Sequence, residues 1–253
     1  MCNDYSCLVT QSRQVIWKRG ISSHDKLETM FKNDYPELQS ERRFVKVEIT
    51  PDKGYLYPEK PWSFQVDEEI IPSWFTDEHK LSAKRAHRQW KKEVYSFINL
   101  EEARNPINPL AKAHKPTKAD IELLKQWASV GDSVRDSVWA SVGDSVGDSV
   151  RDSVWASVGD SVRDSVRDSV WDSVRDSVRD SVWASVRASV GDSVRDSVRA
   201  YTGSLFTIWN GEYKFTPAVE LWKRGLVASY DRKTWRLHTG PKAKIVYEWT
   251  PDK

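Results

Sequence analysis

The chain has 253 residues and a net charge of +2, and 30% of its residues are charged. Its two cysteines, Cys2 and Cys7, provide neither a disulfide framework nor a zinc site with suitably spaced further ligands. The sequence contains no hydrophobic signal region and no apolar stretch long enough to cross a bilayer. We therefore expect a cytoplasmic protein, or alternatively a virion component, with no membrane association.

Residues 1–104 are predicted to form a small α+β region. Hydrophobic alternation and turn residues indicate, in order, a hairpin at 7–18, a short helix near 27–31, a strand at 44–49, strands within 55–66, and a helix from about 76 to 98. The last helix has a basic side that can contact phosphate, but a solvated helix face is the favoured interpretation.

Residues 105–116 contain three prolines and are predicted to be a linker. Thr117 then begins a Thr-Lys-Ala-Asp sequence that is typical of a capping box, followed by regularly spaced apolar residues. A helix is therefore expected at residues 117–126, directly before the most unusual part of the chain.

Residues 127–198 consist of eighteen consecutive four-residue units that all end in Ser-Val. In an α-helix the Val stripe would drift by about 40° per unit, leaving no fixed apolar face along the whole run. A flat strand would have no apolar face either. A coil that turns a corner once per unit places Val and Ser inside and the variable Trp, Gly, Arg, Asp and Ala residues outside. The first residue of a unit recurs most often three or four units later.

The sequence therefore predicts a mainly β fold, a tetrapeptide-repeat β-solenoid over residues 127–200. A four-sided coil is favoured and a three-sided coil is the alternative. The small α+β flanking regions are expected to act as caps, with the 117–126 helix covering one end and an aromatic-rich segment, residues 201–253, covering the other. This C-terminal segment is expected to include a β-hairpin at 234–249.

The run resembles a shortened form of the pentapeptide-repeat proteins, which are four-sided right-handed β-solenoids. It departs from them in having four residues per side and in having Val where that family has Leu or Phe. The Asp-Ser-Val-Arg, Asp-Ser-Val-Trp and Ala-Ser-Val-Gly units also resemble those of uncharacterised bacterial and phage proteins. Neither resemblance implies an activity for this chain, because fold alone does not determine function.

Aromatic and basic residues at the unit corners are the predicted functional residues. An exposed surface of this composition is typical of a partner site, although the indoles could instead cover their neighbours' aliphatic parts. The candidate partner-binding residues are Trp127, Trp139, Trp155, Trp171, Trp183, Arg135, Arg151 and Arg167.

The function expected from these residues is non-enzymatic: a structural or interaction protein that binds itself or a protein partner. We find no motif for catalysis, for a metal or for a cofactor, so none of these is predicted. The alternative is a nucleic-acid-associated protein or DNA mimic. It is not favoured, because the thirteen Asp and nine Arg of residues 127–200 give that run a net charge of −4.

Overall fold

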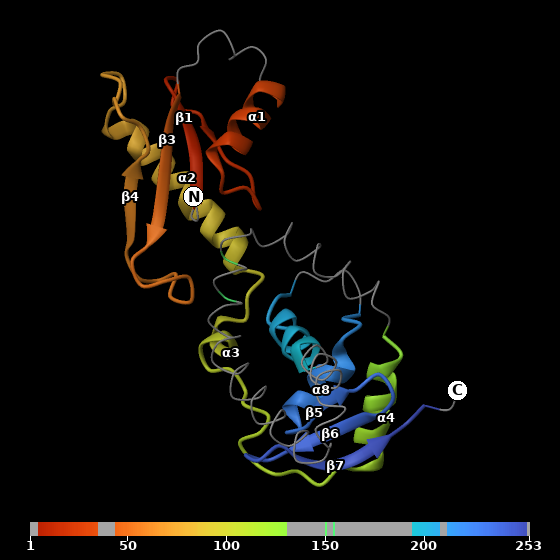
Figure 1. Ribbon diagram of the computed structural model, residues 1–253. Helices are drawn as coiled ribbons and strands as arrows, with labels where there is room; N and C mark the ends of the chain where they lie inside the picture. Colours follow the sequence, from red (N-terminus) through yellow and green to blue (C-terminus); the bar gives the residue numbers. More distant parts are fainter. Residues whose placement is uncertain are drawn as a thin grey trace. The chain divides into compact units, whose positions relative to one another are not determined.

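The computed structural model describes residues 5–34, 44–130, 150, 154, 194–207 and 212–251. These residues fall into two compact units, each of which is described by itself. The first contains residues 5–34 and 44–98, and the second contains residues 99–130, 194–207 and 212–251 (Figure 1). Each unit has one small antiparallel sheet accompanied by helices, which makes the described part of the chain an α+β fold.

The first unit is built on a four-stranded antiparallel sheet with the order β2-β1-β3-β4. Its strands are β1 (Tyr5–Thr10), β2 (Val15–Ile16), β3 (Phe44–Pro51) and β4 (Trp62–Val66). Alternate residues of β3 are buried, as its hydrophobic pattern predicts. The pairing of β3 with β4 ends at Val47 and Val66, so Asp67 directly follows the edge strand.

Two helices cover opposite faces of this sheet. Leu8 of β1 packs against α1 (His24–Asp34), in a cluster that includes Leu27. Tyr5 of the same strand lies 5.3 Å, between ring centroids, from Trp90 of α2 (Asp77–Tyr95). Residues three apart in a strand point to opposite faces, so β1 lies between the helices and all of its residues are buried.

The second unit combines a three-stranded antiparallel sheet, in the order β5-β6-β7, with helices. Its named elements are α3 (Leu100–Arg104), α4 (Lys118–Ala128), α8 (Thr216–Lys223), β5 (Val227–Tyr230), β6 (Trp235–Thr239) and β7 (Lys244–Trp249). Residues 194–203 are also helical. One hydrophobic core joins α4, α8 and the sheet, with Leu124, Trp127, Leu221 and Leu237 among its buried members.

Residues 105–116 contain no helix or strand but are fixed to the second unit. The backbone N–H of Ile107 donates to the hydroxyl of Tyr201 at 2.8 Å, and its carbonyl accepts from the Trp222 indole at 2.9 Å. The rings of Tyr201 and Trp222 stack with centroids 5.2 Å apart. This proline-containing segment is therefore ordered through contacts that its sequence does not reveal.

The predicted mainly β solenoid is wrong for the residues that the structure describes. The helix expected at 117–126 is present as α4, but it continues through the first repeat residues, Trp127 and Ala128. At the other end of the run, residues 194–200 are helical, and so are Val150 and Val154. None of these described repeat residues lies in a β-strand, and both sheets come from outside the run.

The helical ends of the run have a simple physical reason. A Val stripe that drifts by about 40° per unit leaves one face only over many units. The described helix that begins at Val194 contains the Val residues of two units, and a single drift of about 40° keeps both on the same side. Val194 and Val198 accordingly lie four residues apart on one helical face, and both are buried.

Of the described helices, none combines the length and the apolar character needed to cross a membrane.

We expect Trp127→Arg to destabilise the second unit by about 4 kcal/mol, because it removes a buried indole and buries a charge. Trp127 is 1% exposed and lies edge-on to Phe215, with centroids 6.0 Å apart. Urea denaturation of the full chain measures the effect. Gln126→Arg, at the exposed neighbouring position, is the control and should change stability by less than about 0.5 kcal/mol. Equal stability of the two variants would contradict the burial of Trp127.

Candidate functional site

A groove of about 840 Å³ runs beside the edge strand β7 in the second unit. Four consecutive residues of β7, numbers 244–247, line it. Among the described residues, β7 pairs only with β6, so its other edge has no neighbouring strand. The groove therefore lies where β7 can still offer backbone groups for hydrogen bonding.

The opposite wall consists of residues 113–116, with Ile121 of α4. The N–H of His114 donates to the Thr239 hydroxyl at 2.8 Å, and that hydroxyl donates to the carbonyl of Gly225 at 2.8 Å. Gly225 has a φ of +79°, and a Cβ added to it would lie 3.3 Å from the carbonyl oxygen of Pro109. Glycine thus permits the close approach of this segment to the end of α8.

The Asp120 side chain connects the groove wall, residues 113–116, to α4. Its carboxylate is fully buried and accepts from the N–H and the hydroxyl of Thr117, both at 2.8 Å. The His114 Nε2 lies 3.1 Å from it, and the Arg224 guanidinium lies 3.2 Å from it. Burial acts to raise the pKa of Asp120, but the hydrogen bonds from Thr117 and His114 outweigh it and leave that pKa below its usual value. The carboxylate is therefore charged, and its contacts connect the groove wall to α4 and to the end of α8.

The groove is apolar along its length and basic at its surface. Its lining residues are Ala113, His114, Lys115, Pro116, Ile121, Lys244, Ile245, Val246 and Tyr247. Lys115 and Lys244 are both exposed, and none of the lining residues is acidic. Such a surface can accept an extended chain that combines apolar side chains with negative charge.

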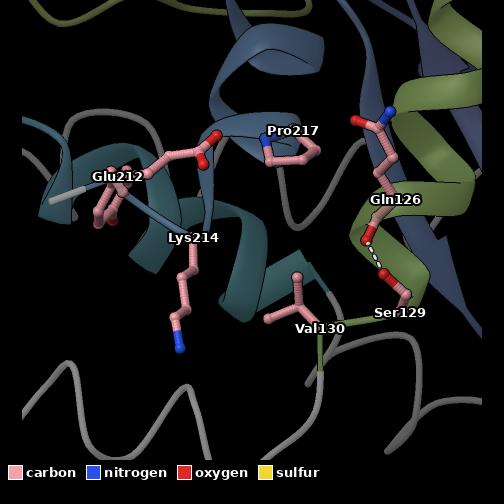
Figure 2. A pocket seen from close by; sticks show the side chains of 7 residues that line it. Gln126, Ser129, Val130, Glu212, Lys214 and Pro217 are labelled. Carbon is pink, nitrogen blue, oxygen red and sulfur yellow. Dashed lines mark hydrogen bonds between the residues drawn. The ribbon is translucent and has the colours of Figure 1, made fainter.

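A second, smaller pocket of about 350 Å³ lies between the end of α4 and residues 212–217 (Figure 2). Ser129 donates to the carbonyl of Gln126 at 2.7 Å on one side of it. The side chains of Glu212 and Lys214 on the other side point in different directions (Figure 2). With charges of opposite sign and no converging polar groups, this pocket supports no particular ligand.

Ser229 and His238 resemble a catalytic pair by distance but not by accessibility. The Ser229 hydroxyl lies 2.7 Å from the His238 Nε2, and the His238 Nδ1 lies 3.0 Å from the carbonyl of Ala243. Both side chains are fully buried between β5 and β6. Because no substrate can reach the hydroxyl there, the pair joins two strands and has no nucleophilic role.

Of the predicted partner-binding residues, the structure describes one. Trp127 is buried in the core of the second unit and is not part of a contact surface. The others, Arg135, Trp139, Arg151, Trp155, Arg167, Trp171 and Trp183, lie outside the described residues.

The groove itself was not predicted. The sequence predicts the strand β7. It predicts a linker at residues 105–116, because three prolines interrupt any regular pattern there. A group of possible metal ligands in the first unit, His24, Glu48 and Asp67, was also missed, because its members are far apart in the sequence.

Comparison with protein-family models, with curated proteins and with solved structures gives no match for this chain. The function must therefore be argued from the residues themselves.

We expect Asp120→Asn to destabilise the second unit by about 3 kcal/mol, because an amide cannot accept all of the hydrogen bonds that the buried carboxylate receives. Glu220→Gln is the matched control. Glu220 lies 4.0 Å from the same Arg224 side chain but is partly exposed, and its loss should change stability by less than about 1 kcal/mol. Chemical denaturation of both variants gives the comparison. Similar losses would show that Arg224, and not the buried carboxylate, is the important partner.

We also expect the second unit to lose stability between about pH 6.5 and pH 4 because of His238. Burial lowers the pKa of its imidazole from 6.5 to about 4. The unfolded state therefore takes up the proton first as the pH falls, and the stability present above pH 6.5 is progressively lost. Denaturant titrations at several pH values measure the slope, which should be flatter for His238→Gln. An unchanged slope in that variant would contradict this assignment.

Proposed function

We propose that the second unit is a protein-binding module that takes an extended, acidic segment of a partner protein into the groove beside β7. The observation that carries the proposal is an edge strand with an unpaired side, set against a fixed wall that bears basic residues. The proposed role is non-enzymatic and depends on binding alone.

The edge of β7 favours an extended occupant. A peptide that runs beside an edge strand gains main-chain hydrogen bonds, and alternate side chains enter the neighbouring pockets. Ile245 and Tyr247 are both partly exposed and offer apolar contacts along β7. The pairing with β6 shifts its register between Leu237 and His238, so these two side chains lie on opposite faces of the strand at an irregularity of the edge. The wall at Pro116 and Ile121 supplies the facing apolar surface.

Charge complementarity favours an acidic occupant. Lys115 stands on the wall and Lys244 on the strand, so positive charge borders both sides of the groove. The Asp120 carboxylate beneath the wall is paired with the Arg224 guanidinium and hydrogen-bonded with His114, and it does not line the groove. Charges in such positions steer association and select among partners more than they add affinity.

A nucleic acid is the alternative that the sequence leaves open, and it receives less support here. Binding to a nucleic acid depends mainly on contacts between cations and several phosphates. The groove offers two lysines among mostly apolar residues, and Tyr247 is the one aromatic side chain in its lining. This composition suits a peptide better than a phosphate backbone.

The proposal is tested with a display library of random octapeptides selected on the full chain. We expect the selected peptides to alternate apolar and acidic residues, and to bind the Lys115→Glu/Lys244→Glu double variant at least about tenfold more weakly than the wild type, a loss of about 1.4 kcal/mol. Lys118→Glu is the control, because Lys118 is an exposed lysine nearby that does not line the groove.

Three outcomes would contradict the proposal: no enriched peptides, enrichment without an acidic bias, or equal binding to the double variant. Titration with a single-stranded oligonucleotide forms the second arm. Tight, salt-sensitive binding that the double variant loses would assign the groove to nucleic acid instead.

A further inference from the structure

Three potential metal ligands from separate elements meet in the first unit. His24 is the first residue of α1, Glu48 lies on β3, and Asp67 directly follows β4. The His24 Nδ1 lies 3.0 Å from the Asp67 Oδ2 and 4.0 Å from the Glu48 Oε1. All three ligand atoms lie within 4.8 Å of one another, although 43 residues separate His24 from Asp67.

Both ring nitrogens of His24 lie close to oxygen atoms. The side chain is buried, with 3% of the residue exposed, and its Nε2 lies 3.3 Å from the carbonyl oxygen of Val47. Both ring nitrogens therefore face oxygen acceptors, whereas a neutral imidazole carries only one N–H. If Nε2–H donates to Val47, the lone pair of Nδ1 faces the carboxylate of Asp67. In this tautomer the Nδ1 lone pair and the Asp67 carboxylate are directed to the same point, where both can bind a metal ion.

The spacing suits a metal ion. Nitrogen and oxygen ligands bound at about 2.1 Å lie about 3.0–3.4 Å apart in octahedral or tetrahedral geometry. The separation of His24 from Asp67 already falls in this range, and the Glu48 carboxylate, 4.0 Å from the His24 Nδ1, needs to move closer. The contact from Nε2 to a backbone carbonyl is the interaction that usually orients a metal-binding histidine.

Further carboxylates surround the three ligands. Glu28 of α1 pairs with Lys46 at 2.8 Å, and Glu68 accepts a hydrogen bond from the backbone N–H of Lys46 at 3.1 Å. The hydrogen bond with Glu28 is the main cause that raises the pKa of Lys46, with Glu68 and Asp25 adding to it through their charge. Lys46 lies two residues before Glu48 on β3, so these carboxylates bring negative charge to the neighbourhood of the three ligands, which favours a bound cation.

We propose that His24, Glu48 and Asp67 bind a divalent transition-metal ion of the Zn²⁺ or Mn²⁺ class. An imidazole with two carboxylates matches the ligand preference of these ions, whereas Mg²⁺ and Ca²⁺ prefer oxygen ligands alone. Three protein ligands leave coordination positions for water. The Asp67 side chain is 51% exposed, so the ion is reachable from solvent. The bound ion joins α1, β3 and the end of β4.

The test uses the full chain without an affinity tag, stripped of metal and titrated separately with Zn²⁺, Mn²⁺ and Mg²⁺ by calorimetry. We expect one site that binds Zn²⁺ or Mn²⁺ and not Mg²⁺. Asp67→Asn keeps the size of a half-exposed side chain and should weaken binding by about tenfold or more. Asp77→Asn is the matched control: this carboxylate is 90% exposed on α2, pairs with Lys80, and should leave the affinity unchanged.

Nuclear magnetic resonance of the His24 ring gives a second, independent measurement of metal binding. We expect Zn²⁺ to shift its Nδ1 resonance and leave Nε2 protonated. Failure of the wild type to bind Zn²⁺ or Mn²⁺ would overturn the proposal. Equal affinity in Asp67→Asn would also overturn it, since binding would then involve other residues.

Discussion

The second unit depends on one buried carboxylate. Asp120 accepts hydrogen bonds from Thr117, lies within hydrogen-bond distance of His114 and pairs with Arg224, so one side chain joins a loop, the start of α4 and the end of α8. A buried charge is tolerated only when its surroundings satisfy it, and each of these segments is held in place by that requirement. The groove has a fixed wall because the segment that forms it is one of the three.

Local signals in the sequence predict much of the fold outside the repeat. The capping box at Thr117 predicts α4, the alternation at 44–49 predicts β3, and the turn near Gly240 predicts the hairpin of β6 and β7. Each of these signals depends on residues that are close together in the sequence. The helical ends of the repeat could not be predicted in this way, because a sequence of poor helix formers becomes helical there through burial against the rest of the unit.

The candidate sites could not be predicted from the sequence either, because they too depend on contacts between residues far apart in the chain. The groove wall is a proline-containing segment whose order comes from contacts with Tyr201, Trp222 and Thr239, about one hundred residues further along the chain. The possible metal ligands lie on a helix, a strand and a loop, and no spacing rule connects them. The groove belongs to the second unit and the possible metal ligands belong to the first.

The lysine on β7 has a consequence for the protein in concentrated solution. A strand with the sequence Lys-Ile-Val-Tyr-Glu-Trp and an open edge is a template for pairing with the same strand of another molecule. A parallel, in-register approach of two copies would bring Lys244 beside Lys244, which opposes that contact. An antiparallel approach can instead place Lys244 beside Glu248 of the other copy, which is an attractive pairing. The charges of this edge therefore select the direction in which it could pair with a second copy of itself.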